Sequence, residues 1–278
     1  MVKIITDSTC DMTAERLAAL DIEMVPLTVH FGDAAYADKR DLDNSTFYQM
    51  LRQAKTLPTT SQVNPADFEA VFRRQLDAGH TVVGLFLSSK LSGTVQSAHI
   101  AAEMIGSKDI YVIDSLTTTL GLSLLLELAA ARRDAGASAA ELAAELEVLS
   151  RKVLIYAVVD TLKYLKMGGR LSAASAAIGE FLGISPVISL NGGLVESVGK
   201  GRGKAAAYGK MGELYRAATP DMGYPVSVGH TDTPTEMARV LEALGGVYDP
   251  ARVIENEIGS IIGTHVGPGA AGVAFICK

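Results

Sequence analysis

The stretch HTVVGLFLSSKLSGTVQSAHIAAEMIGSKDIYVIDS, from His80 to Ser115, decides the fold class because it places one helix between two apolar strands. The runs HTVVGLFLS and DIYVIDS are nearly continuous in apolar residues, which is typical of parallel strands covered on both faces. Between them, GTVQSAHIAAEMIG begins and ends with glycine and is predicted as a helix. A strand, a helix and a strand in this order predict one crossover unit of a parallel sheet.

The residues around this unit continue the alternation. VKIITDST at the start and IEMVPLTVHF from Ile22 are predicted as strands, and TAERLAALD between them as a helix with Thr13 as its N-cap. A helix that begins at Asn44 or Ser45 follows. Another is predicted from Pro65 to Gly79, because proline is favoured in the first turn of a helix and glycine just after its end. Two Ala/Leu-rich helices, at about 120–135 and in SAAELAAELEVLSRK, come after the crossover unit. The first half is therefore predicted to be a mostly parallel sheet with helices on both faces.

The second half of the chain differs from the first in composition and in its predicted elements. It contains glycine pairs, a long helix of low charge, a predicted hairpin around SLNGGLVES and a late strand, GVAFIC. Asn191, Gly192 and Gly193 are residues that suit a tight hairpin turn. The expected fold class is thus α/β, with an N-terminal α/β domain over 1–152 and a second α+β domain over 153–278 whose sheet is mainly antiparallel.

Composition excludes several functions. The net charge of −6 gives no basic footprint for nucleic acid, and 48% apolar residues suffice for a sizeable core. The N-terminus lacks the features of a signal peptide, and the longest apolar stretches are too short to span a membrane, so a cytoplasmic location is expected. Cys10 and Cys277 are expected to be reduced thiols, with a bridge between them as the alternative. The histidines show no metal-binding spacing, so neither a metal nor a cofactor is predicted.

Hydroxyl-bearing segments follow several of the predicted strands. TDST, LSSKLSGT and VIDSL lie at strand ends, where parallel sheets collect ligands, and PTTSQ is expected on a loop between helices. In LSSKLSGT, Ser92 and the free amide groups of a helix that opens at Gly93 suit a carboxylate or a phosphate. The alternative is an N-cap in a Ser-rich turn. The spacing matches neither a nucleotide loop nor a nucleophile elbow.

Two glycine-rich segments stand out in the second half. GTHVGPGAAG, from Gly263, surrounds His265 with glycines that allow close approach to a ligand, although a lone histidine is often structural. YLKMGGRLSAASAAIGEFLGISP holds Arg170 and a helix over about 171–182 whose only charge is Glu180. Such a helix is commonly buried core. The alternative is a lid over an apolar ligand, hinged at the glycine pair, that rests transiently on a membrane surface when open.

Taken together, the motifs resemble those of a known family. ITDSTCDM, PTTSQ, LSSKLSGTVQSA, VIDSL, DTLKYLKMGGR and GTHVGPGAAGVAF occur in an order and spacing similar to the DegV family of bacterial fatty-acid-binding proteins, which includes the FakB subunits of fatty acid kinase. The resemblance extends over essentially the whole chain. It implies a carrier rather than an enzyme, with one long-chain fatty acid in an apolar tunnel at the domain interface. It also implies a kinase subunit as partner, which would turn the acid into an acyl phosphate for phospholipid synthesis.

The resemblance also implies site residues. The carboxylate contacts would be Thr60, Ser92 and His265. Supporting positions would be Ser61, Gly93, Thr94, Arg170, Gly267 and Gly269, with amide groups of the glycine loop as additional donors, and Arg202 would belong to a kinase-docking face. Two segments depart from the family pattern: Ser185 stands where a lysine is usual, and VGKGRGKAA is diluted by glycine. These departures put the kinase interaction more in doubt than lipid binding.

Two other functions remain open at this stage. Ser92 and His265 could act as nucleophile and base of an acyl hydrolase, although no G-x-S-x-G is present and no acid can be named to orient His265. A regulatory scaffold without a ligand is the second alternative. A monomer is the default expectation for the oligomeric state.

Overall fold

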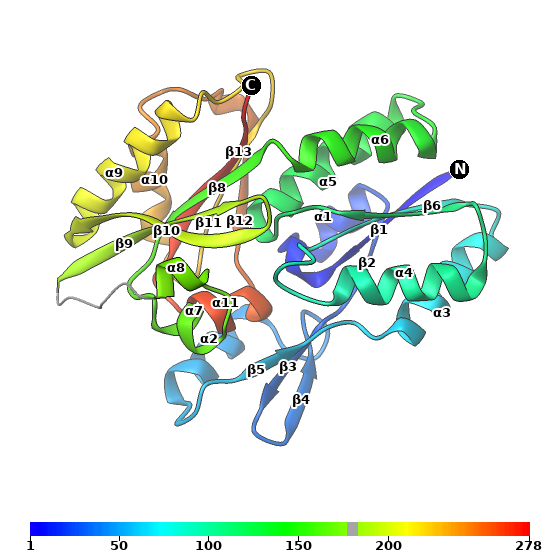
Figure 1. Ribbon diagram of the computed structural model, residues 1–278, viewed down its shortest axis with the longest axis horizontal. Helices are drawn as coiled ribbons and strands as arrows, with labels where there is room; N and C mark the ends of the chain where they lie inside the picture. Colours follow the sequence, from blue (N-terminus) through cyan, green and yellow to red (C-terminus); the bar gives the residue numbers. More distant parts are fainter. Residues whose placement is uncertain (177–182) are drawn as a thin grey trace.

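The computed structural model describes residues 1–176 and 183–278, which form three sheets with helices around them (Figure 1). The first sheet has the order β2-β1-β6-β7 and is parallel throughout. Its strands are β1 (Val2–Asp7), β2 (Ile22–Val25), β6 (Thr81–Phe86) and β7 (Ile110–Asp114). The crossover unit predicted over 80–115 is confirmed, with α4 (Thr94–Ile105) as its helix.

Helices cover both faces of this sheet (Figure 1). One face packs on α3 (Pro65–Asp77) and α4, and the other on α1 (Ala14–Ala19), α5 (Thr119–Asp134) and α6 (Ala139–Ser150). Successive side chains of a strand point to opposite faces, so Ile4 and Val83 join the α5 side while Ile5 and Val82 join the α3 side. Two-sided burial explains why these strands are continuous in apolar residues.

The segment expected as one strand over 22–31 is two strands in different sheets. β2 ends at Val25, and β3 (Thr28–Phe31) pairs with β4 (Ala34–Ala37) and β5 (Thr59–Ser61) in a three-stranded antiparallel sheet. Pro26 lies between them and has no N–H for a ladder, and Leu27 N donates to Ser8 Oγ at 3.1 Å instead. The expectation of a single strand was wrong, as was the expectation that 58–62 is all loop. The helix α2 (Asn44–Gln53) is capped by Asp43.

The largest sheet has the order β10-β9-β8-β13-β11-β12, and every pair is antiparallel except β11 with β12. Its strands are β8 (Val153–Val158), β9 (Ile184–Asn191), β10 (Leu194–Arg202), β11 (Val226–His230), β12 (Val253–Glu257) and β13 (Ala271–Ile276). The predicted hairpin is confirmed: Gly192 and Gly193 join β9 to β10 with φ of 55° and 88°. The α/β fold class, with one parallel and one mainly antiparallel sheet, is confirmed.

The remaining helices pack on this sheet, on one another or on the other two sheets. They are α7 (Lys163–Met167), α8 (Ala173–Ala176), α9 (Gly203–Ala217), α10 (Met237–Ala243) and α11 (Ser260–Val266), with short 3-10 helices η1 (Ser8–Cys10), η2 (Pro234–Glu236) and η3 (Pro250–Arg252). Of the helix expected over 171–182, the structure describes α8, and residues 177–182 lie outside the described part. The lid hypothesis rested largely on Ile178, Glu180, Phe181 and Leu182, which are among them.

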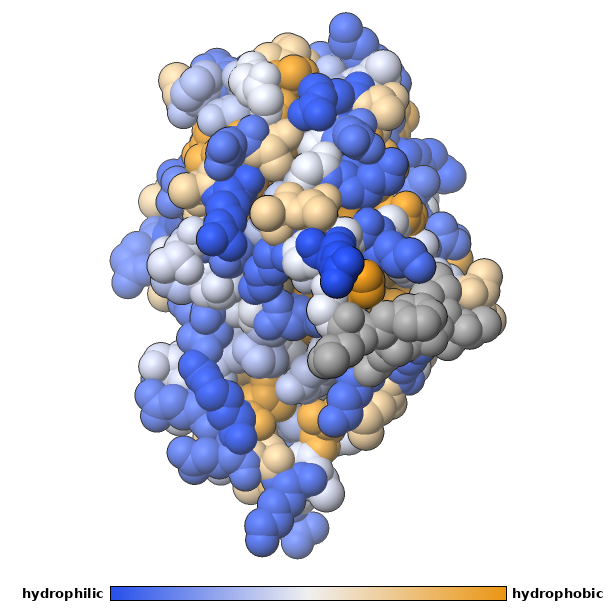
Figure 2. Space-filling model, turned by 90° about the vertical axis from the view of Figure 1, so that its left-hand side faces the viewer, coloured by the Kyte–Doolittle hydropathy of each residue, from blue (hydrophilic) through white to orange (hydrophobic). Residues whose placement is uncertain are grey.

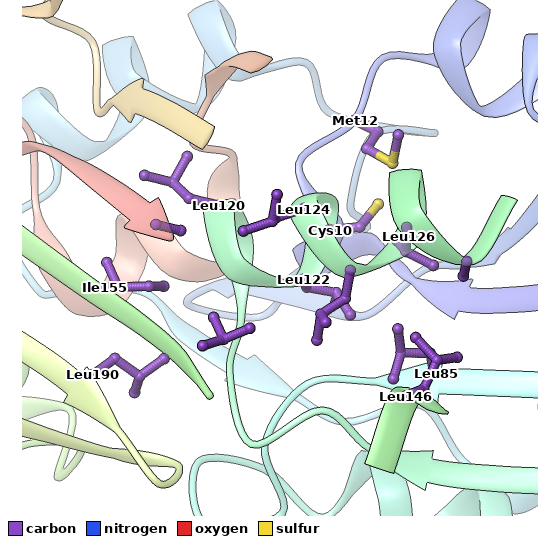
Figure 3. Packing of buried hydrophobic residues seen from close by; sticks show 14 of the residues in the cluster. Cys10, Met12, Leu85, Leu120, Leu122, Leu124, Leu126, Leu146, Ile155 and Leu190 are labelled. Carbon is purple, nitrogen blue, oxygen red and sulfur yellow. The ribbon is translucent and has the colours of Figure 1, made fainter. Parts of the chain in front are cut away.

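Helix α5 is the element that both large sheets share. Its first half is buried on all sides, and Leu120, Leu122 and Leu124 are at most 1% exposed. Figure 3 shows these leucines between Ile155 and Leu190 of the mixed sheet and the side of the core that holds Cys10 and Leu85. One hydrophobic core therefore runs across both sheets. The division into domains 1–152 and 153–278 stays a prediction.

No helix in the described ranges, 1–176 and 183–278, has both the length and the apolar character to cross a membrane.

Candidate functional site

A cavity of about 340 Å³ lies among the sheets, within the range of ~300–1,000 Å³ that ligand pockets commonly have. Half of its lining side chains are aliphatic. The lining residues are Leu27, Thr60, Ser61, Gln62, Leu87, Leu91, Ser92, Gly93, Thr118, Leu165, Arg170, Val195, Ile261, Ile262, His265 and Val266. These described lining residues include one cation, Arg170, and no carboxylate. The cavity thus suits a ligand that is mostly apolar and has an anionic or polar end.

Thr60 and His265 form the polar centre of this lining. Thr60 comes from β5, opposite Val29 of β3, and His265 from the last turn of α11, so 205 positions in the chain separate them. Thr60 Oγ1 lies 2.8 Å from His265 Nε2. Burial, followed by the charge of Arg170, lowers the pKa of His265 to about 4. The imidazole is therefore neutral at pH 7 and can both donate and accept.

The Nδ1 side of the His265 imidazole faces Gly168, which Arg170 contacts in turn. Arg170 donates from Nη1 to the carbonyl of Gly168 at 2.6 Å and from Nε to that of Leu91 at 3.2 Å, which fixes the guanidinium at the cavity wall. A Cβ on Gly168 would lie 2.3 Å from His265 Nδ1, so only glycine lets the imidazole sit there. His265 Nδ1 is buried with no hydrogen-bond partner among the described residues.

Ser92 serves the helix and the cavity at the same time. Its Oγ accepts from Thr94 N at 3.3 Å and lies 3.0 Å from Thr94 Oγ1, which forms a serine turn just before α4. The N-cap residue of α4 is Gly93, so the alternative of Ser92 as N-cap was wrong. The same residue lines the cavity. Gly93 packs closely on Gln62, because a Cβ there would fall 2.1 Å from Oε1 of Gln62 and would displace this side chain. Thr94 itself is fully buried in the first turn of α4 and is absent from the described cavity lining.

The predicted glycine-loop donors are not available to a ligand, so that expectation was wrong. Gly267 N donates to Gly263 O at 2.8 Å, and Gly269 N to Thr231 O at 2.9 Å. Both glycines have positive φ and shape the turn after α11: a Cβ on Gly267 would strike the ring of Tyr164, and one on Gly269 would strike Asp160.

Ser61 and Arg202 lie at the margin of the site or beyond it. Ser61 lines the cavity, and its Oγ is 2.8 Å from His30 Nε2. Arg202 is exposed at the end of β10, outside the described lining.

A second cavity, of about 310 Å³, lies against the same polar centre. It shares Thr60, Arg170 and His265 with the first cavity. Its other lining residues are Leu57, Pro58, Thr59, Tyr164, Met167, Gly168 and Thr264. The three shared residues therefore lie between the two cavities. Met167, which lines the second cavity, is 64% exposed, so this cavity lies near the protein surface.

Two polar lining residues escaped the sequence reasoning as individual candidates. Gln62 belongs to the quoted PTTSQ segment, and its Nε2 donates to Ser97 Oγ at 2.8 Å, which joins β5 to α4. Thr118 follows β7, and a run of three threonines after a strand end was the only signal for it. Within the described part of the chain, no three His, Cys, Asp or Glu side chains are grouped so as to hold a metal ion.

The sheets and this cavity define an α/β protein with an internal, largely aliphatic cavity that carries a single cation among its described lining residues. A family model described as "Uncharacterised protein, DegV family" matches residues 1–278. The chain belongs to the DegV family. It is 36% identical to a DegV domain-containing protein of Deinococcus radiodurans, over 99% of this chain and 98% of that protein. It is 32% identical to Protein DegV of Bacillus subtilis, over 100% and 99%.

Solved structures agree with this assignment. A DegV family protein from Thermus thermophilus, described by its fatty acid binding, superposes with a TM-score of 0.90 at 33% identity, covering 100% of this chain and 99% of that chain. DegV of Bacillus subtilis, described as a fatty acid binding protein, gives a TM-score of 0.85 at 31% identity with the same coverage. A stearic-acid-binding protein from Eubacterium ventriosum gives 0.85 at 29% identity, again over 100% and 99%.

Proposed function

We propose that this protein binds one long-chain fatty acid in the 340 Å³ cavity, with the carboxylate at Thr60, Ser92 and His265 and the acyl chain along the aliphatic lining. The observation that carries the proposal is the Thr60–His265 pair, 2.8 Å apart, in a lining that has one cation and no carboxylate among its described residues. The solved relatives described as fatty-acid-binding support the ligand class.

The polar centre suits a carboxylate because such an anion needs donors once it leaves water. A neutral imidazole with its proton on Nε2 donates to Thr60 Oγ1, and the threonine hydroxyl is then free to donate to the ligand. Arg170 adds a positive charge at the same wall. His265 thus orients the hydroxyl of Thr60 and does not need to carry charge itself.

The aliphatic lining supplies the affinity for the chain. Burial of each methylene contributes about 0.8 kcal/mol, so a long acyl chain gains far more than the head group before the cost of ordering it is subtracted. The lining comes from loops that follow strands of the parallel sheet, from Val195 of the mixed sheet, and from β5, α7 and α11. Contributions from both halves of the chain suit a tunnel at the interface of the proposed domains.

Presentation of the carboxylate to a kinase subunit is the second part of this proposal. The second cavity reaches Thr60, Arg170 and His265 from the other side of the wall, so a partner could approach the head group while the chain stays enclosed. Arg202 is exposed, as a docking residue must be. The face shown in Figure 2 is mostly hydrophilic, with small separated hydrophobic patches among its described residues, which suits a polar contact. We place this reaction in the cytoplasm.

A carrier fits the geometry better than an acyl hydrolase. A serine hydrolase needs its histidine within reach of the serine and oriented by an acid. Here His265 Nε2 contacts Thr60, Ser92 Oγ contacts Thr94, and Nδ1 of His265 has no partner among the described residues. An anion held by these groups would be bound and not cleaved.

Native mass spectrometry of the protein as purified from a bacterial host tests the proposal. We expect a mass increment of one fatty acid per chain, lost after delipidation and restored by octadecanoate. A protein that stays empty when incubated with saturated and unsaturated acids of fourteen to eighteen carbons would refute fatty acid binding. Acyl phosphate formation with a kinase subunit and ATP tests presentation separately.

A further inference from the structure

Thr118 has an unusual position in the cavity lining. It is the N-cap residue of α5, and its carbonyl accepts from the amide groups of Gly121 and Leu122. Threonine is favoured at an N-cap because its hydroxyl accepts from a first-turn amide. Here the side chain makes no such bond, so the hydroxyl is not used by the helix.

The hydroxyl of Thr118 is buried and unsatisfied. The residue is 6% exposed, and Oγ1 has no hydrogen-bond partner among the described residues. The other hydroxyl and amide side chains of the described lining do have partners: Thr60 with His265, Ser61 with His30, Gln62 with Ser97 and Ser92 with Thr94. An unsatisfied buried hydroxyl carries a desolvation penalty that a ligand oxygen can remove.

Thr118 enters the cavity lining from another part of the chain than Thr60, Arg170 and His265. It precedes α5, whereas Thr60 belongs to β5, Arg170 follows α7 and His265 belongs to α11. Thr118 is also absent from the described lining of the second cavity, which shares Thr60, Arg170 and His265 with the first. For the proposed ligand we therefore place Thr118 beside the acyl chain and not beside the carboxylate.

We propose that Thr118 is a specificity-determining contact for an oxygen on the acyl chain, so that the cavity takes hydroxylated fatty acids in preference to plain ones. This inference rests on the proposed function and extends it to a narrower ligand class. A threonine hydroxyl donates and accepts, which matches a chain hydroxyl in either direction. A plain chain leaves the Thr118 hydroxyl unpaired, and sites built to bond a hydroxyl discriminate against ligands that lack it.

The test compares octadecanoate with a series of hydroxyoctadecanoates that carry the hydroxyl at successive chain positions. Dissociation constants are measured on delipidated wild-type protein, on Thr118→Val and on the control Thr117→Val. Valine keeps the shape of threonine and removes the hydroxyl. Thr117 is a matched control because its Oγ1 is also buried without a described partner, yet Thr117 is absent from the cavity lining.

We expect wild type to bind one positional isomer about 10- to 100-fold more tightly than octadecanoate, as a buried hydroxyl pair predicts. Thr118→Val should lose this preference and keep or improve its affinity for octadecanoate, while Thr117→Val keeps the wild-type ratio. The inference is overturned if wild type and Thr118→Val bind hydroxyoctadecanoate and octadecanoate with the same ratio of affinities. A site in which water pairs with the Thr118 hydroxyl would give that result. Weakened octadecanoate binding in Thr118→Val also overturns the inference, because Thr118 would then contact the carboxylate. Failure of wild type to bind any acid overturns the proposed function and this inference together.

Discussion

His265 illustrates how a buried side chain acquires its role from its neighbours. It is uncharged at pH 7 because burial and Arg170 disfavour the imidazolium, and it contacts Thr60 instead of a carboxylate. A neutral imidazole next to a hydroxyl directs the hydroxyl hydrogen, whereas an imidazolium would hold the ligand by charge. The two roles make different predictions for substitution and for pH.

Replacement of Thr60 by valine tests the hydroxyl as a donor. We expect Thr60→Val to weaken fatty acid binding by about 10- to 100-fold, because a hydrogen bond to a charged group contributes roughly 1.5–3 kcal/mol. Thr59→Val is the matched control, since Thr59 is the neighbouring strand residue and is exposed on the side of the second cavity. Titration calorimetry measures both, and equal affinities in the two variants would contradict the assignment.

The stability of the empty protein should depend on pH through His265. The pKa of His265 is about 4 in the folded protein and 6.5 in the unfolded chain. Between these pH values the unfolded chain therefore binds the proton more readily than the folded protein. Stability from the neutral imidazole is present above pH 6.5 and is lost as pH falls toward 4. Between pH 7.5 and 4.5 we expect wild type to lose about 2–3 kcal/mol more than His265→Gln, which does not titrate. If the unfolding midpoints of wild type and His265→Gln change equally between pH 7.5 and 4.5, the lowered pKa of His265 is contradicted.

The site could be predicted only in part from the sequence. Ser92 and His265, which both line the cavity, were predicted from residue types that follow a strand or lie among glycines, which are local signals. The amide groups of Gly267 and Gly269 were expected to be free and are bonded to Gly263 and Thr231, which only the folded turn reveals. Thr118 differs from Thr117 solely in which side of the loop faces the cavity, and no sequence pattern encodes that.

At the scale of elements, strand β10 and helix α9 pack unusually closely. A Cβ on Gly201 would lie 2.1 Å from the amide nitrogen of Ala207, which is backbone and cannot move aside. This contact accounts for glycine at position 201, one of the three glycines that dilute the segment 198–206.

Gly201→Ala tests this packing against Gly209→Ala. We expect Gly201→Ala to lower the free energy of unfolding by several kcal/mol, since overpacking against a backbone forces strand and helix apart. Gly209 lies within α9 with nothing near its missing Cβ, so alanine there should stabilise by about 0.5–1 kcal/mol. Urea unfolding of both variants checks the pair, and a neutral Gly201→Ala would refute the close approach.

Most elements could be predicted because their signals are local. The Pro65 helix start, the Thr13 cap and the turn at Gly192 and Gly193 each depend on a few neighbouring residues. The three-stranded sheet could not be predicted, because β5 is short and forms a strand only by pairing with β3, about thirty residues earlier in the chain. The break at Pro26 was visible as a residue, but its consequence, a change of sheet, depends on Ser8 accepting Leu27 N–H.

On the scale of the whole molecule, α5 couples the two large sheets. Leu122 is fully buried in the core that both sheets share. We expect Leu122→Ala to cost about 2–5 kcal/mol and to speed amide exchange in β6 and in β13 together. The exposed Val148→Ala of α6 should leave both strands unchanged. Faster exchange confined to one of the two sheets would show that they unfold independently.

The lining of the cavity is drawn from segments between Leu27 and Val266. A molecule that fills it touches segments from both halves of the chain at once. If it binds the native chain and not the unfolded one, the free energy of unfolding rises with the logarithm of its concentration above the dissociation constant. In a cell, the empty form would open more often and meet proteases more often. The abundance of this protein would then follow the supply of its ligand through turnover alone, without any change in transcription.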